Sequence, residues 1–108
     1  MTKQEAVANH RKMWNWIADQ IEKAKRARNI DELKDYYVHY IYGEYVWFDC
    51  FCCEYDEEQG IESCTHCPLV WPDGKCGPLY GVCCMCSDYV KQVKFARQIA
   101  NLPEREDV

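Results

Sequence analysis

Six of the nine cysteines in this sequence form three pairs with the spacing C-x-x-C, a pattern suited to metal binding. Cys50 and Cys53 form the first pair, and Cys64 and Cys67 follow after ten intervening residues. A C-x-x-C turn lets two thiolates converge on one ion, and backbone amides in the turn can donate hydrogen bonds to the sulfurs. The two pairs therefore predict a tetrahedral site of four thiolates carried by a tight hairpin.

Zinc is the metal that the sequence favours, because Zn²⁺ prefers thiolates, has no redox chemistry and supplies folding free energy to a small chain. An iron–sulfur cluster uses the same number of thiolates and is the alternative metal centre. Disulfides are less favoured because nine is an odd number and the charged N-terminus lacks a secretory signal, which indicates a cytosolic protein. Cys76 follows nine residues after Cys67 and is a fifth candidate ligand.

The third pair, Cys83 and Cys86, has two interpretations. Together with Cys52 and Cys76, it could build a second metal site. It also precedes the last predicted helix, where a low-pKa thiol would suit a redox protein, although the βαβ context of such proteins is missing. A separate interpretation, which concerns Cys84 and some of the other thiols, is that they are apolar filler of the core.

The residues outside the cysteine pairs show no pattern that predicts catalysis. Four thiolates close the coordination sphere of zinc, and the chain has no H-E-x-x-H, G-x-S-x-G or phosphate-binding glycine motif. His10 and His39 lie on predicted helices and are expected at the edge of the core. His66 lies between two candidate ligands and is expected to point to solvent. We therefore expect a protein that is not an enzyme.

The charge is distributed unevenly along the chain, whose net charge is −5. Residues 1–30 carry seven basic and three acidic side chains, a balance of +4, and residues 31–108 carry six and fifteen, a balance of −9. Lys23, Lys25, Arg26 and Arg28 are the candidate nucleic-acid contacts. We favour the simpler explanation that they are solvated cations at the C-terminal end of a helix, where they complement its dipole.

The pattern of apolar residues predicts the elements that position these side chains. A spacing of three and four residues predicts a helix over residues 3–28, and Asp31 is expected to cap a second helix that stops at Gly43. The aromatic run at 44–55 is typical of a strand or extended segment, and 64–86 is rich in Cys, Pro and Gly. Ser87 or Asp88 then caps a last helix.

The expected fold is mainly α, a small single domain of about three helices with a zinc-stapled hairpin or knuckle. The expected parts of this domain are the N-terminal helices (1–43), the cysteine-rich zinc region (44–86), the C-terminal helix (87–103) and a charged tail (104–108).

Four segments of the sequence, "HRKMWNWIA", "CFCCEY", "CTHCPLVWPDGKC" and "ARQIANLPERE", resemble a group of small cysteine-rich proteins carried by phages and prophages of Firmicutes. The resemblance covers about two-thirds of the chain. It implies a zinc-stapled accessory protein whose paired ligands match Cys50, Cys53, Cys64 and Cys67, with Cys76 as the trailing cysteine. The group carries no activity to transfer, and the cysteines at 83, 84 and 86 depart from its pattern.

Small phage accessory proteins often act by stoichiometric binding, and this association suggests an inhibitor of a host defence protein, such as a CRISPR-type nuclease, in the host cytoplasm. The partner-binding residues expected on this basis are Trp16, Glu54, Asp56, Glu57 and Glu58, with Trp47 or Trp71 as further aromatic anchors. The apolar stretches are too short to span a bilayer, so no membrane partner is expected. A nucleic-acid-binding zinc module and a thiol redox protein are the alternative functions.

Overall fold

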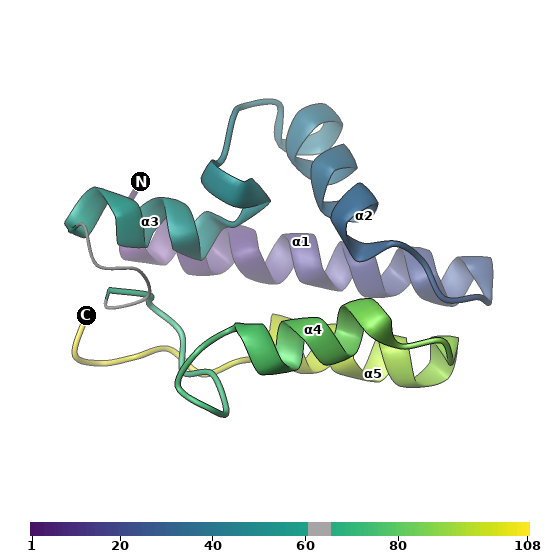
Figure 1. Cartoon of the computed structure of the whole chain (residues 1–108). Coiled ribbons are helices and arrows are strands. Elements are labelled where there is room, and N and C mark those ends of the chain that lie inside the picture. The colour runs from purple at the N-terminus through teal and green to yellow at the C-terminus, as the bar shows by residue number, and fades with distance from the viewer. Residues whose placement is uncertain (61–65) are drawn as a thin grey trace.

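A computed structural model describes residues 1–60 and 66–108, which are mainly helical. The helix α1 (Lys3–Ala24) runs through the middle of the molecule, between α2 and α3 on one side and α4 and α5 on the other (Figure 1). α5 (Tyr89–Ala100) packs along α1, and α4 (Gly77–Met85) packs against α5. The mainly α-helical prediction is confirmed, but the described residues form five α-helices and not three.

The core lies mainly between α1 and α5, and it confirms the apolar stripe predicted for the first helix. Trp14, Ile17 and Ile21 are buried there against Ala96 and Ile99. Thr2 caps α1, because its hydroxyl accepts a hydrogen bond of 3.1 Å from the amide of Glu5. A buried stripe with a capped N-terminus explains why this segment is the longest helix.

The first helix was predicted to reach Arg28 but ends at Ala24, because Lys25 adopts a left-handed conformation with φ 53°. The buried amide of Gln92 holds the segment that follows. Its Oε1 accepts from the amide N–H of Arg28, and its Nε2 donates to the carbonyl of Arg28, both at 2.9 Å. These bonds occupy both backbone groups of Arg28 outside a helix, so the chain turns here.

The second helix is capped by Asn29, not by Asp31, since Asn29 Oδ1 accepts from the amide of Glu32 at 3.0 Å. It runs as α2 (Ile30–Tyr36) and continues without a break as a π-helix, η1 (Tyr37–Tyr42). Gly43 ends it with φ 85°, as predicted, because glycine adopts this left-handed conformation without a steric penalty.

The prediction of a strand or extended segment over 44–55 is wrong. The chain forms a 3-10 turn, η2 (Trp47–Asp49), and then the helix α3 (Phe51–Gln59). Cys50 caps α3 with its sulfur, which accepts from the amide of Cys53 at 3.2 Å. The carboxylate of Glu54 reaches back to the amide of Trp47 at 2.7 Å. These local bonds outweigh the β propensity of the aromatic residues.

A helix also forms within the region 64–86, which is rich in Cys, Pro and Gly. α4 begins at Gly77, and Pro78 lies in its first turn, where a missing amide N–H costs nothing. α5 begins after Asp88, as predicted, and it ends at Ala100. The only pairing of β type among the described residues is an isolated antiparallel bridge between Leu69 and Glu104.

Candidate thiol centre and partner surface

Five cysteines gather around one pocket, which lies between α3, the segment 67–76 and the C-terminal tail. The pocket has a volume of about 680 Å³. The five cysteines that line it, called the thiol cluster below, are Cys50, Cys52, Cys53, Cys67 and Cys76. Three of them, Cys50, Cys53 and Cys67, are predicted first-choice ligands, and Cys76 is the fifth candidate ligand, whereas Cys52 was expected in a second group. The other first-choice ligand, Cys64, lies outside the described residues.

α3 places three thiols of this cluster within its first turn. Cys50 is the N-cap residue, Cys52 is fully buried, and Cys53 follows at the next position. The hydrogen bond between Cys53 and Cys50 lowers the pKa of Cys50, while it raises the pKa of Cys53. Of the two thiols, Cys50 therefore loses its proton more readily.

Cys52 and Cys67 form a second pair of interacting thiols. The S–H of Cys52 faces the sulfur of Cys67 and raises the pKa of Cys52. The same contact lowers the pKa of Cys67 to about 6, assisted by the amide of Leu69 and the indole of Trp71, while burial opposes the shift. The cluster thus holds two sulfurs whose pKa values lie below that of an ordinary thiol, and the thiolate is the form that binds metals.

Two buried nitrogen atoms next to this cluster lack a hydrogen-bond partner among the described residues. Trp71 Nε1 faces the sulfur of Cys67 but makes no hydrogen bond of normal geometry, and His66 Nδ1 also has no partner in the described part of the chain. His66 was predicted to point to solvent, but it is half-buried and its amide donates to Asp56 Oδ1 at 2.6 Å. A buried indole N–H beside a sulfur is best satisfied when that sulfur is an anion.

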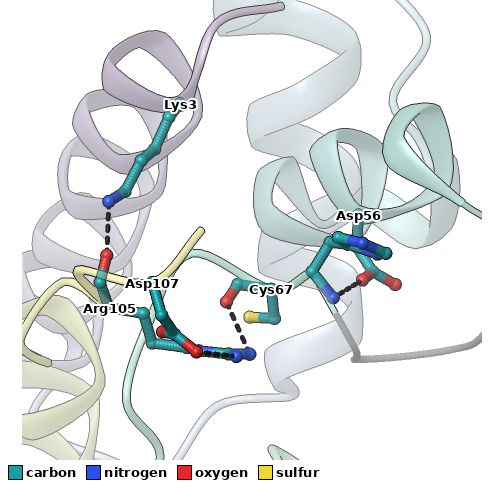
Figure 2. A network of polar contacts seen from close by, with 6 residues as sticks. Lys3, Asp56, Cys67, Arg105 and Asp107 are labelled. Atoms are coloured by element: carbon teal, nitrogen blue, oxygen red, sulfur yellow. Dashed lines mark hydrogen bonds and ion pairs between the residues drawn. The ribbon is translucent and has the colours of Figure 1, made fainter.

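The C-terminal tail closes one side of the pocket (Figure 2). Arg105 Nη1 donates to the carbonyl of Cys67 at 3.3 Å, and Arg105 pairs with Asp107 at 2.9 Å. Lys3 Nζ donates to the carbonyl of Arg105, which joins the start of α1 to the same network. Two backbone bonds of 2.8 Å link the tail to the segment 68–70.

The thiols lie near one another but are not arranged as ligands. Within residues 1–60 and 66–108, no three His, Cys, Asp or Glu side chains have the geometry to hold a metal ion. The donor set nevertheless fits zinc, because thiolates are its preferred ligands and a buried indole N–H is available to a coordinated sulfur.

The structure does not bring the second predicted group together. Cys52 contacts Cys67 in the thiol cluster. Cys83 is fully buried in α4, and its S–H points to the carbonyl of Gln92 at 3.8 Å. Cys86 ends α4 and donates to the carbonyl of Asp88 at 3.3 Å. Burial raises the pKa of Cys83 to about 12, the opposite of what a redox thiol requires.

The predicted partner residues differ in their exposure and in their contacts. Trp16 is half-buried and stacks on Tyr36, with ring centroids 5.8 Å apart and ring planes 3° apart. Glu54 is engaged with the amide of Trp47, and Asp56 is buried. Glu57 and Glu58 are exposed on α3.

The two remaining aromatic anchors and the basic cluster also differ in exposure. Trp47 is 41% exposed, whereas Trp71 is buried in the core at 8%. Lys23, Lys25 and Arg26 are exposed at the C-terminal end of α1, as expected for cations that complement the helix dipole. Arg28 is half-buried beside Gln92.

Sequence reasoning missed an acidic and aromatic surface formed by residues 30–60. Exposed aromatic side chains cluster between Tyr36 and Phe48. Lys34 is the only Lys or Arg between Arg28 and Lys75. It is buried, with its Nζ 4.6 Å from the ring centroid of Tyr80. The long absence of basic residues was a visible signal for this surface.

Comparisons with known proteins found no match: no family model, curated protein or solved structure matches the chain. No helix among the described residues is long and apolar enough to cross a bilayer.

Proposed function

We propose that the thiol cluster is a structural zinc centre and that the protein acts by stoichiometric binding to a protein partner, without catalysis. The observation that carries the metal centre is the convergence of five cysteines from two separate segments, 50–53 and 67–76, on one pocket. Such convergence is unusual for cysteines that serve only as apolar filler, which scatter through a core.

The chemistry of the cluster supports zinc in a structural role. Cys50, Cys53, Cys67 and Cys76 would supply four thiolates from α3, the segment 67–76 and the residue before α4. Four thiolates leave no open position for water or substrate, so bound zinc would supply folding free energy and no catalysis. Cys52 would remain a neighbouring thiol, and Trp71 Nε1 would donate to a coordinated sulfur.

The binding role rests on different support. The resemblance to phage accessory proteins suggests inhibition of a host defence protein, such as a CRISPR-type nuclease, in the host cytoplasm. The acidic surface of residues 30–60 fits a basic partner protein. The alternative of nucleic-acid binding through Lys23, Lys25, Arg26 and Arg28 is less favoured, because the same surface would repel a phosphate backbone.

Native mass spectrometry of protein purified without added metal tests the zinc centre. We expect the mass of one zinc ion, which is lost on acid denaturation, and a helical circular dichroism signal that decreases when a chelator removes the metal. Cys67→Ser should lose the zinc, whereas the matched variant Cys86→Ser, at a thiol outside the cluster, should retain it. Metal-free wild-type protein that is folded, or zinc retention in Cys67→Ser, would contradict the proposal.

A further inference from the structure

Six large apolar side chains are exposed on one continuous stretch of chain, which includes the end of α2, η1 and η2. Tyr45 is 79% exposed, Phe48 is 73% exposed and Tyr40 is 69% exposed. This set, called the aromatic band below, consists of Tyr36, Tyr40, Ile41, Tyr45, Trp47 and Phe48. Exposed apolar side chains that are this large and this close in sequence mark an interaction surface.

The aromatic band is held in place by the core beneath it. Tyr36 stacks on Trp16, and the ring centroid of Tyr40 lies 4.9 Å from that of Tyr36. Val46 is buried at 1% between the exposed residues Tyr45 and Trp47, so it anchors the connecting segment. The backbone that carries the band is therefore anchored at Tyr36 and Val46, which lowers the entropy cost of binding.

The chain segment that carries the aromatic band is strongly acidic. Residues 30–60 contain nine acidic side chains and one basic side chain, a balance of −8. The single base, Lys34, is directed inward, where its Nζ lies 3.4 Å from Tyr80 Oη and 3.5 Å from the carbonyl oxygen of Phe48. The exposed carboxylates on the elements of the band are Asp31, Glu32, Asp35 and Glu44.

The exposed aromatic side chains and the nearby carboxylates together indicate the chemistry of the partner. We propose that the aromatic band docks an arginine-rich segment of a partner protein, an inference that rests on the stoichiometric binding proposed above. A guanidinium group stacks on aromatic faces and pairs with carboxylates, whereas an ammonium group does this less well. A second copy of the chain would place one acidic surface against another, and a nucleic acid would also be repelled.

A binding assay with a labelled synthetic arginine-rich peptide tests the proposal, and a peptide with lysine in place of every arginine is the probe control. We expect the arginine peptide to bind at low ionic strength, more tightly than the lysine peptide, and to weaken as salt is added. The triple variant Tyr40→Ser, Tyr45→Ser and Phe48→Ser should weaken this binding by about tenfold or more.

The matched control is the triple variant Val82→Ser, Met85→Ser and Val90→Ser, which changes exposed apolar side chains on α4 and α5. It should change the affinity by less than about twofold, since surface substitutions away from an interface have small effects. Circular dichroism of both variants should match that of the wild-type protein.

Three results would overturn the inference: no binding of the arginine peptide at low salt, equal binding of both peptides, or equal losses in the two triple variants. A dimer that dissociates in the aromatic-band variant would identify a second copy as the occupant instead. Zinc content measured on the same sample separates the two proposals. Zinc-loaded protein that ignores the peptide contradicts only the docking surface, whereas metal-free folded protein that binds it contradicts only the metal centre.

Discussion

His10 shows at the scale of one residue how the core constrains a titratable group. It is 2% exposed, and its Nε2 lies 2.9 Å from the carbonyl oxygen of Ile99, to which the neutral ring donates. Burial disfavours the imidazolium and lowers the pKa of His10 to about 4, against the opposing effect of the Ile99 carbonyl. The folded state therefore keeps this histidine neutral.

A pH dependence of stability follows from this shift. The pKa of His10 is lower in the folded state, about 4, than the 6.5 of an exposed histidine, so the unfolded state binds more protons between these values. Stability is then fully present above pH 6.5 and is lost as the pH falls toward 4. We expect the contribution of His10 to fall by about 2 kcal/mol between pH 6.5 and pH 5, measured by urea unfolding.

The comparison variants are His10→Gln, which removes the titration, and His39→Gln, which changes an exposed histidine on η1. His10→Gln should be less stable at pH 7 but should lose most of this pH dependence. His39→Gln should behave as the wild-type protein does. If the unfolding free energies of the wild-type protein and of His10→Gln changed in parallel with pH, the assigned pKa would be wrong.

At the scale of elements, capping explains where α5 begins. Asp88 Oδ1 accepts from the amides of Val90 at 3.0 Å and Lys91 at 3.4 Å. The sequence left Ser87 and Asp88 as equal candidates for this cap, because both side chains can accept such a bond. The contacts of the Asp88 carboxylate assign the cap to Asp88, and its charge also complements the N-terminal helix dipole.

We expect Asp88→Ala to lower the unfolding free energy by about 1 kcal/mol, since it removes the capping bonds of α5. Ser87→Ala, at the exposed residue just before the cap, should change it by less than about 0.5 kcal/mol. Denaturant unfolding of the two variants measures both values. Equal losses in the two variants would assign the cap to neither residue alone.

The same elements show how far sequence could predict the fold and the site. The spacing of Trp14, Ile17 and Ile21 correctly predicted the buried face of α1. Hydrophobicity alone does not predict which residues of α5 are buried, because Val90 is 63% exposed and Gln92 is fully buried. Gln92 is buried because its amide satisfies backbone groups of two other segments, through bonds to Arg28 and Cys83, and such long-range pairing leaves no periodic signal.

The sequence predicted which cysteines lie in the thiol cluster better than it predicted how the chain arranges them. Spacing identified Cys50, Cys53, Cys67 and Cys76 as neighbours, because C-x-x-C pairs keep their sulfurs close in any compact turn. Cys52 lies outside the three C-x-x-C pairs and was therefore assigned to another group. The helix α3 instead brings Cys52 to the pocket with Cys50 and Cys53.

At the scale of the whole molecule, the C-terminal tail holds two distant parts of the chain together. Arg105 of the tail and the preceding Pro103 each make a backbone bond of 2.8 Å to the segment 68–70, and the tail joins the start of α1 through Lys3. The tail also contributes Glu104, Arg105 and Asp107 to the lining of the thiol pocket. It therefore covers the thiols as well as closing the fold.

Deletion of residues 104–108 should expose the thiol cluster. We expect alkylation of Cys67 by iodoacetamide, followed by peptide mass spectrometry, to become about tenfold faster than in the full chain, because local opening costs less without the tail contacts. Cys86 lies outside the pocket, and its rate is the internal control. Equal rates at Cys67 with and without the tail would contradict its covering role.

The pairing of α1 with α5 has a consequence for synthesis on the ribosome. α1 ends at Ala24 and α5 begins at Tyr89, so the first long helix is translated well before its main packing partner exists. The buried stripe of α1 stays without that partner until residues 89–100 have left the exit tunnel. Until then, the nascent chain presents the apolar stripe of α1 to chaperones.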